Sequence, residues 1–173
     1  AGRSLPEVMM ILVPEAWEKN AEMSEAKRAF YEYHSCMMEP WDGPASIPFT
    51  DGNFIGAVLD RNGLRPSRYT VTKDDYVVMS SETGVVDITP ENVDFHGRLQ
   101  PGKMFLVNME EGRIINDEEI KENIAQKFPY KKWLNDNLVH LKDIPYNDCP
   151  LFLGEESLEK RKSVFGYTFE DIN

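Results

Sequence analysis

The stretch from residue 42 to residue 82 constrains the fold of this chain more than any other part. Its apolar residues stand in four short runs, at residues 45–49, 54–59, 69–71 and 76–79, and turn-forming residues separate the runs. Short runs that are rich in β-branched and aromatic residues are typical of β-strands. The sequence therefore predicts four consecutive strands that pair as an antiparallel meander.

The connections between these runs have recognisable turn residues. Asp51-Gly52 is predicted to form a type I′ hairpin turn, because both residues tolerate positive φ. In the longer connection 60–66, Asp60 is expected to bond the backbone ahead of it and Gly63 to take a left-handed conformation, while Pro66 prevents a helix. Residues 73–75 are expected to close the last hairpin.

Helices are predicted on both sides of the strands. Ser4 and Glu7, with a proline between them, have the pattern of a capping box, and the apolar helix that follows is expected to be buried on every side until Pro14. Ser24 is the predicted N-cap of a second helix. Further helices are predicted at residues 117–128, 130–141 and 157–165, a hairpin at 102–108 and 112–115, and a loop with short strand pieces at 84–98.

The charge balance limits the partners of this chain. With 30 Asp and Glu against 19 Lys and Arg, the net charge is −11, and the sequence has no basic cluster. Nucleic acids and anionic membranes bind to basic surfaces, so we expect neither as a partner. No apolar run approaches the roughly 20 residues that span a bilayer, and the first residues lack the order of a signal peptide. We expect a cytoplasmic location, or the plastid stroma in a plant or alga.

The cysteines and histidines do not form a recognisable reactive or metal-binding motif. Cys36 and Cys149 lie far apart without CxxC spacing, so we expect reduced, buried structural thiols. Each histidine stands alone, and an isolated histidine is more often a structural or surface residue than part of a site. The three are His34, His96 and His140. No metal ligand set and no catalytic residue are predicted in this chain.

Three acidic residues are candidates for a general acid, namely Glu39, Asp60 and Glu82, because a carboxyl group desolvated at a strand end can have a raised pKa. A turn-forming role explains Asp60 fully, whereas Glu82 leaves a strand where loops form clefts. Arg65 and Arg68 are expected to pair with these acids. The residues predicted to support a cleft or a turn are Glu39, Asp42, Asp60, Gly63, Arg65, Ser81 and Glu82.

Several motifs resemble the large, or single-chain, subunit of the glutamate synthase family. They are the segments at residues 33–46, 51–52, 60–69 and 81–84, and they are similar to the latter part of its class II glutamine amidotransferase domain. The pattern D-x-x-G-x-[RK]-P at residues 60–66 is shared by other class II amidotransferases, whereas E-P-W-D-G-P at residues 39–44 is specific to the glutamate synthases. The segments at residues 2–6, 14–17 and 165–168 are also similar to this family, so the resemblance extends over essentially the whole chain.

The resemblance implies part of an N-terminal-nucleophile hydrolase fold, an α+β architecture in which two antiparallel sheets pack between helical layers (αββα). It implies that residues 1–142 are the latter part of the amidotransferase domain and residues 143–173 a linker toward the central domain. In this family an N-terminal cysteine attacks glutamine with its own α-amino group as base, and an Asn-Gly pair forms the oxyanion hole. The ammonia passes to a flavin domain that converts 2-oxoglutarate into glutamate, using FMN, an iron–sulfur cluster and NADPH, NADH or ferredoxin.

The sequence departs from the family pattern at the nucleophile. Residue 1 is alanine, and neither Cys36 nor Cys149 has a free α-amine. We therefore expect this chain to be inactive alone and to need the upstream half of its domain and the central and flavin domains as partners. Its uncovered apolar helix predicts instability or self-association. A non-catalytic binding or scaffold module, a domain of another class II amidotransferase, and a hydrolase that uses Glu82 or Glu39 are the alternatives.

Overall fold

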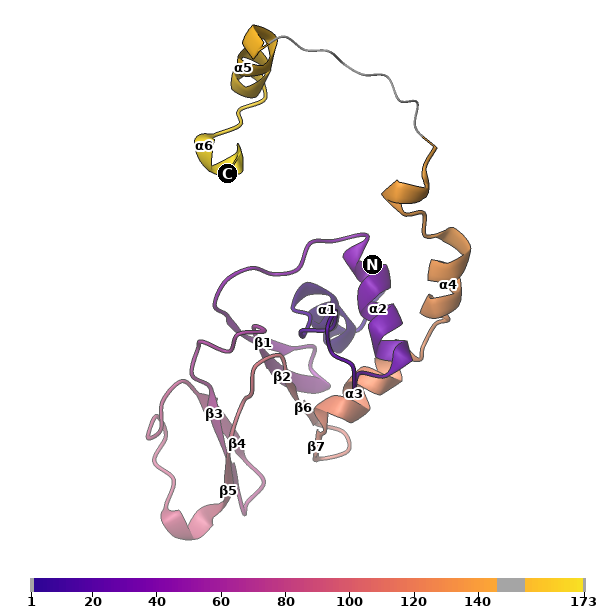
Figure 1. The fold of residues 1–173 in the computed structure, drawn as a ribbon. Helices are drawn as coiled ribbons and strands as arrows, with labels where there is room; N and C mark the ends of the chain where they lie inside the picture. Colours follow the sequence, from indigo (N-terminus) through magenta and orange to yellow (C-terminus); the bar gives the residue numbers. More distant parts are fainter. Residues whose placement is uncertain (1, 146–154, 173) are drawn as a thin grey trace. The chain divides into compact units, whose positions relative to one another are not determined.

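The computed structural model describes residues 2–145 and 155–172 (Figure 1). The chain divides into two compact units, residues 1–138 and residues 139–173. The helices of the first unit are α1 (Leu5–Leu12), α2 (Glu25–Ser35), α3 (Asp117–Ala125) and α4 (Tyr130–Asn137), with a 3-10 turn at Pro90–Asn92. Its strands are β1 (Ser46–Thr50), β2 (Phe54–Leu59), β3 (Arg68–Thr72), β4 (Val77–Ser80), β5 (Val93–Arg98), β6 (Met104–Asn108) and β7 (Arg113–Ile115).

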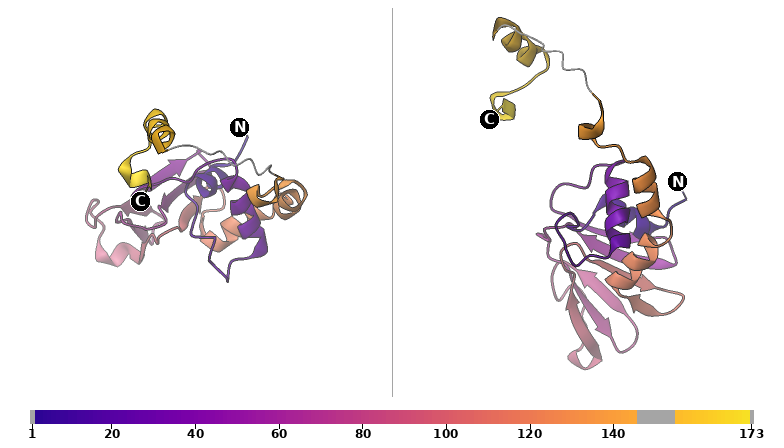
Figure 2. Two further views of the ribbon diagram at one scale, coloured as in Figure 1. Left: turned by 45° about the horizontal axis from the view of Figure 1, so that its top comes forward. Right: turned by 45° about the vertical axis from the view of Figure 1, so that its right-hand side comes forward.

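The strands form two antiparallel sheets. The first has the order β1-β2-β6-β7 and the second the order β4-β3-β5. The predicted α+β class is therefore confirmed at the level of antiparallel sheets with helices. In the two further views of Figure 2, as in Figure 1, helices α1 to α4 lie on one side of the first sheet and the second sheet lies on its other side.

The predicted meander is wrong, because β2 pairs with β6 and not with β3. Residues 57–59 of β2 are buried, so this strand needs cover on both faces. The helices cover one face, and the chain crosses after Asp60 to start a second sheet that covers the other. Turn residues identify where a strand ends, but the burial of its faces decides which strand becomes its neighbour.

The prediction of a loop with short strand pieces at residues 84–98 is confirmed in part. Residues 84–92 lie outside the strands, whereas residues 93–98 form the complete strand β5. Strand β5 pairs with β3 from Arg68 opposite Arg98 to Thr72 opposite Val93. Four of its six residues are exposed, which is why its sequence lacks a strong apolar alternation. Pairing to a neighbour, and not local propensity, makes this segment a strand.

The turns follow the prediction in part. The 73–75 turn closes the β3–β4 hairpin, with Asp75 at a φ of 66°. Asp51-Gly52 does connect β1 to β2, but Asp51 is not among the described residues with positive φ, so a type I′ turn is excluded. Instead, the carboxylate of Asp51 accepts hydrogen bonds from the backbone N–H groups of Asn53 and Phe54, at 3.0 and 2.8 Å.

The capping residues begin the helices as predicted. The hydroxyl of Ser4 accepts a hydrogen bond from the backbone N–H of Glu7, and the hydroxyl of Ser24 accepts one from the backbone N–H of Lys27. Helix α1 is less enclosed than predicted, because Val8, Ile11 and Leu12 are only half-buried. The predicted helices 117–128 and 130–141 end earlier, at Ala125 and Asn137.

Two apolar clusters hold the layers together. The larger one joins the helices to the first sheet and contains Phe30 and Met10, which are almost completely buried. The smaller one lies between the sheets and is formed by Ala57, Leu59, Leu99 and Phe105 with side chains of the second sheet packed against them. The first sheet is thus the central layer of three.

Buried charged groups join α3 and the N-terminal segment to this core. Lys121 contacts Glu15 at 3.1 Å and Asp117 at 3.0 Å, and it donates a hydrogen bond to the carbonyl of Gly102 at 2.7 Å. Glu7 is paired with Arg3 and Lys127. Lys121 and Glu7 therefore each have an opposite charge beside them, as a low-dielectric interior requires.

His34 is buried in the same layer and acts as a hydrogen-bonding core residue. Its Nδ1 lies 2.8 Å from the carbonyl of Phe30, and its Nε2 lies 3.0 Å from the guanidinium of Arg3. Since Arg3 only donates, Nε2 accepts and the proton is on Nδ1. Burial is the main cause that lowers the pKa of His34, and Arg3 adds to it.

The second unit contains a 3-10 turn (Leu141–Asp143), α5 (Glu155–Val164) and α6 (Phe169–Ile172). The predicted helix at 157–165 is α5, displaced by one or two residues. Cys149 lies outside the described residues. Within the described ranges, no helix is long and apolar enough to span a membrane.

Gly97 generates a stability prediction. A Cβ at this position would lie 2.0 Å from the ring of Tyr69, and that ring is packed at 4.5 Å from the ring of Phe105 and therefore has little room to move. We expect Gly97→Ala to lower the free energy of unfolding by about 1–3 kcal/mol, measured by urea denaturation. In a Tyr69→Leu background the same change should cost much less, because the obstructing ring is absent. Additive effects of the two substitutions would contradict this account.

Candidate functional site

An open cavity of about 1020 Å³ lies between the two sheets and is named here the inter-sheet cavity. Apolar residues of both sheets form its floor, among them Ala57, Phe105, Val77 and Met79. Loop residues that precede or follow the strands also reach it, among them the polar Arg65, Ser67 and Ser81. A concave, mainly apolar surface with a few polar groups at its rim is typical of binding sites.

Three sequence motifs that are far apart along the chain meet at this cavity. The segment at residues 33–46 supplies Pro44, Ala45 and Ser46 to the lining. The segment at residues 60–69 supplies Arg65, Pro66 and Ser67, and Ser81 comes from the segment at residues 81–84. The motifs that carry the family resemblance therefore lie around one hollow, which makes it the candidate functional site.

Asp60 fixes two of these segments to each other. One carboxylate oxygen accepts a hydrogen bond from the backbone N–H of Ala45 at 3.1 Å, and the other accepts from Asn62 at 2.9 Å and Gly63 at 3.2 Å. The backbone N–H of Asp60 also donates to the carbonyl of Ala45 at 3.1 Å. The predicted turn-forming role of Asp60 is present in the structure, and it extends to the segment before β1.

The environment of Asp60 favours its ionised form. Burial by itself raises the pKa of this carboxyl group, since the side chain is only 3% exposed. The N–H donors of Ala45, Asn62 and Gly63 outweigh that effect and hold the pKa of Asp60 below its usual value. A carboxyl group with a lowered pKa is a poor general acid at neutral pH, so the geometry favours a structural role.

Gly63 has the left-handed conformation predicted for it, with a φ of 61°. A Cβ here would lie 2.4 Å from the ring of Pro101, so the turn has no room for a side chain. Both requirements are met only by glycine. Gly63 thus supports the connection that places Arg65 and Pro66 at the inter-sheet cavity.

The structure brings together some predicted site residues and separates others. Arg65 and Ser81 both line the inter-sheet cavity. Glu39 and Asp42 are exposed on the connection before β1 and are not part of its lining. Glu82 lies beside a different hollow, formed by the second sheet and the following loop. The acids Glu39, Asp60 and Glu82 therefore do not form a common site.

The expected pairing of Arg65 and Arg68 with these acids is wrong for the part of the chain that the structure describes. Neither guanidinium has an ion pair there, and both residues are exposed. Asp60 is fully hydrogen-bonded to backbone groups, so it needs no cation.

Cys36 is exposed at the end of α2, so the prediction of a buried thiol is also wrong for this residue.

Sequence reasoning missed the apolar rim of the inter-sheet cavity. Ile55, Tyr76 and Met109 line it while remaining 48%, 66% and 54% exposed. Their positions in or beside strands gave no signal, because the sequence does not show which strand face a second sheet leaves open. Within residues 2–145 and 155–172, no cluster of three or more His, Cys, Asp and Glu side chains is arranged to hold a metal ion.

A comparison with known protein families adds direct evidence to these structural features. The profile of the class-II glutamine amidotransferases matches residues 1–133, and the chain belongs to this family. The match covers the first unit from its first residue to within α4.

The relatives identify the branch of the family. The chain is 56% identical to the glutamate synthase [NADPH] large chain of Bacillus subtilis, over 99% of its length. It is 44% identical to the glutamate synthase [NADH] of Schizosaccharomyces pombe over 98% of its length, and 45% identical to the ferredoxin-dependent glutamate synthase of Antithamnion sp. over 99%. The predicted resemblance to the glutamate synthase large chain is thereby confirmed. The chain spans only 11%, 8% and 11% of these three relatives.

Asp60 generates a prediction about pH. Its pKa is lower in the folded chain than in the unfolded chain, so its stabilising effect is complete above the unfolded value of about 4 and is lost as the pH falls through the folded value. Asp60→Ala should lower the free energy of unfolding by about 2–3 kcal/mol at pH 7, because it leaves buried N–H groups without an acceptor.

Asp60→Asn retains one acceptor oxygen and removes the charge, so it should weaken the dependence of stability on pH between about pH 5 and pH 3. Urea denaturation across this range measures the effect. Asp42→Asn is the matched control, since Asp42 is exposed and should change stability little. An acid dependence equal in wild type and Asp60→Asn would refute the assignment.

Proposed function

We propose that this chain is the latter part of the glutamine amidotransferase domain of a glutamate synthase, within an N-terminal-nucleophile hydrolase fold. The observation that carries the proposal is the meeting of three family motifs at the inter-sheet cavity of a class-II amidotransferase chain. The parent enzyme hydrolyses glutamine to glutamate and ammonia, and the ammonia is used for the reductive amination of 2-oxoglutarate.

The two sheets support this fold proposal. Helices, the first sheet and the second sheet account for three layers of an αββα sandwich. Strand β1 has a neighbour on one side only in the described chain, and so has β4. Both strands contribute residues to the inter-sheet cavity, with Ser46 and Pro48 from β1 and Val77 and Met79 from β4. Free strand edges beside an apolar hollow are suited to pairing with further strands, which the upstream half of the domain would supply.

The residues of this chain suit a supporting role in the reaction. Cys36 has a peptide-bonded nitrogen, lies at the end of α2 and is not part of the cavity lining, so it does not fit the role of the nucleophile. In the proposed parent, the N-terminal cysteine of the upstream half attacks the glutamine amide and its own α-amine serves as base. Asp60, Gly63 and the backbone around Ala45 would hold the wall against which that half packs.

The remaining parts of the parent lie in sequence that this chain does not cover. The names of the relatives include NADPH, NADH and ferredoxin, and we propose that the electron donor, FMN and an iron–sulfur cluster belong to the central and flavin domains. We further propose that residues 143–173 form the linker toward the central domain. In support, Val164, Phe165 and Tyr167 of the second unit are exposed apolar residues without cover in the described chain.

Each of two alternative functions is supported by one specific observation. The pattern at residues 60–66 is shared with other class II amidotransferases, so a different parent of that class would use the same Asp60 turn. A non-catalytic scaffold would use the apolar rim at Ile55, Tyr76 and Met109 to bind a partner. The identity of 56% to a glutamate synthase over almost the whole chain supports the first proposal over both.

Complementation tests the proposal. This chain should be co-expressed with the amidotransferase segment that precedes the matching region in the Bacillus subtilis relative, and ammonia release from glutamine should be measured. We expect glutaminase activity from the pair and none from either part alone, because the nucleophile and the supporting wall are on different chains. The same pair with the N-terminal cysteine replaced by alanine should be inactive. A pair that associates without releasing ammonia would favour the scaffold.

The exposed rim also predicts the behaviour of the isolated chain. With Ile55, Tyr76 and Met109 open to solvent, sedimentation should show self-association, and a Tyr76→Asp/Met109→Asp variant should sediment closer to a monomer. A wild-type chain that is monomeric and melts in one sharp transition would contradict this expectation.

A further inference from the structure

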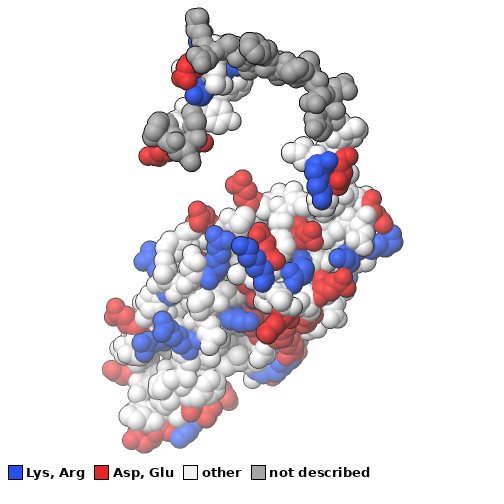
Figure 3. Space-filling model, viewed as in Figure 1, with Lys and Arg blue, Asp and Glu red and all other residues white. Residues whose placement is uncertain are grey.

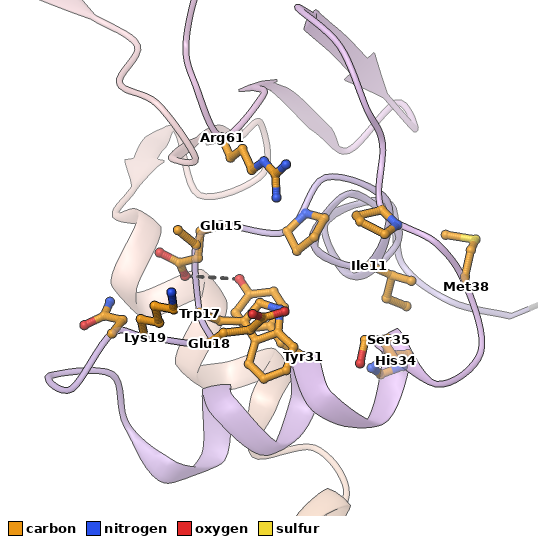
Figure 4. Close-up of a pocket in the computed structure, with 14 residues that line it drawn as sticks. Ile11, Glu15, Trp17, Glu18, Lys19, Tyr31, His34, Ser35, Met38 and Arg61 are labelled. Atoms are coloured by element: carbon orange, nitrogen blue, oxygen red, sulfur yellow. Dashed lines mark hydrogen bonds between the residues drawn. The ribbon is translucent and has the colours of Figure 1, made fainter. Parts of the chain in front are cut away.

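A second cavity of about 530 Å³ lies on the helical side of the first unit and is named here the Trp17 cavity (Figure 4). It is formed by the segment after α1, by one face of α2, by the connection after α2 and by Arg61. None of its lining residues belongs to the lining of the inter-sheet cavity. Its size is in the range of small-molecule sites, which is about 300–1000 Å³.

Hydrogen bonds hold the walls of the Trp17 cavity in place. The hydroxyl of Tyr31 donates to Glu15 at 3.1 Å, the interaction that the dashed line marks in Figure 4. Arg28 donates to the backbone carbonyls of Trp17 and Glu18, at 3.4 and 3.3 Å, and also to that of Asn20. A site whose walls are fixed before binding loses less conformational entropy when a ligand binds.

Among the described residues, two cations of the lining, Lys19 and Arg61, have no ion pair. Glu15 is neutralised by Lys121 at 3.1 Å, and its other contact is the hydroxyl of Tyr31. Glu18 and Lys19 are adjacent, exposed and of opposite sign. Arg61 has no ion pair or hydrogen-bond partner among the described residues, and in Figure 4 its guanidinium points toward the hollow between Glu15 and Tyr31 on one side and Ile11 and Met38 on the other.

On the face of the first unit seen in Figure 3, Lys and Arg side chains lie among Asp and Glu side chains. A guanidinium has a planar set of donors that matches a carboxylate in a bidentate manner. The aromatic side chains of Trp17 and Tyr31 line the same cavity as Arg61.

We propose that the Trp17 cavity binds a small organic carboxylate with a planar, unsaturated body. Arg61 receives the carboxylate, and the planar body lies in the hollow beside Trp17 and Tyr31. The site is formed entirely by residues of the first unit and does not depend on the proposed glutaminase function. Its test is therefore a binding measurement that needs no upstream half.

The loop that contains Arg61 offers a matched control. Arg61 and Arg65 are both exposed and both lie between Asp60 and Pro66, but Arg61 lines the Trp17 cavity and Arg65 lines the inter-sheet cavity. Removing either guanidinium changes the net charge of the chain equally. Only the loss of Arg61 should affect the Trp17 cavity.

Benzoate is the probe, with benzyl alcohol as its uncharged analogue and inorganic phosphate as an anion without a planar body. Binding to the 173-residue chain is measured by calorimetry and by the quenching of tryptophan fluorescence, at probe concentrations up to about 10 mM, because fragments of this size bind weakly. Trp17→Leu identifies the tryptophan that reports binding, since Trp41 and Trp133 remain in that variant.

We expect saturable benzoate binding to the wild type and to Arg65→Gln, and affinity at least about tenfold weaker for Arg61→Gln, as the loss of a charge-assisted hydrogen bond implies. Benzyl alcohol and phosphate should each bind more weakly than benzoate. Circular dichroism confirms that the variants are folded, and Arg61→Lys, which retains the charge, replaces Arg61→Gln if that variant does not fold. Equal benzoate affinity in wild type and Arg61→Gln, or no saturable binding to the wild type, would overturn the proposal.

Discussion

The carboxylate of Asp60 and the backbone N–H groups around it are the interaction on which the arrangement of the first unit depends. It lies where the chain leaves the first sheet and crosses to the second, and it bonds the start of β1 to the turn after β2. A buried carboxylate is stable only when donors surround it, and three N–H groups meet that requirement. The crossing, the left-handed Gly63 and the positions of Arg61 and Arg65 all follow from this fixed turn.

The crossing gives the first sheet a layer on each face. Strand β2 is buried from Gly56 to Leu59 because helices pack on one side of its sheet and the second sheet on the other. The two sheets are not in full contact, and the space that remains between them is the inter-sheet cavity with its apolar rim. The crossing to a second sheet thus produces the core and also leaves the surface that we propose as the packing site of the upstream half of the domain.

The loop between Asp60 and Pro66 contributes Arg61 to one cavity and Arg65 to the other, but the two cavities differ in chemistry. The inter-sheet cavity is wide, apolar and lined by the family motifs, which suits the packing of further strands. The Trp17 cavity is smaller, and the guanidinium of Arg61 in its lining is the group that we propose to bind a carboxylate. The membership of the chain in the class-II amidotransferases bears on the first cavity, whereas only the local geometry bears on the second.

The sequence by itself determined the local features of this protein, and the motifs in it also identified the family. The caps at Ser4 and Ser24, the left-handed Gly63, the 73–75 turn and most strand positions depend on interactions among a few neighbouring residues, which the sequence shows directly. Only the tertiary structure decided that β2 pairs with β6, that residues 93–98 form a strand and that Arg65 meets Ser81 at a cavity that Glu39 and Glu82 do not reach. These features arise from burial summed over segments that are distant in sequence, and the free energy of such contacts is not encoded in any short stretch.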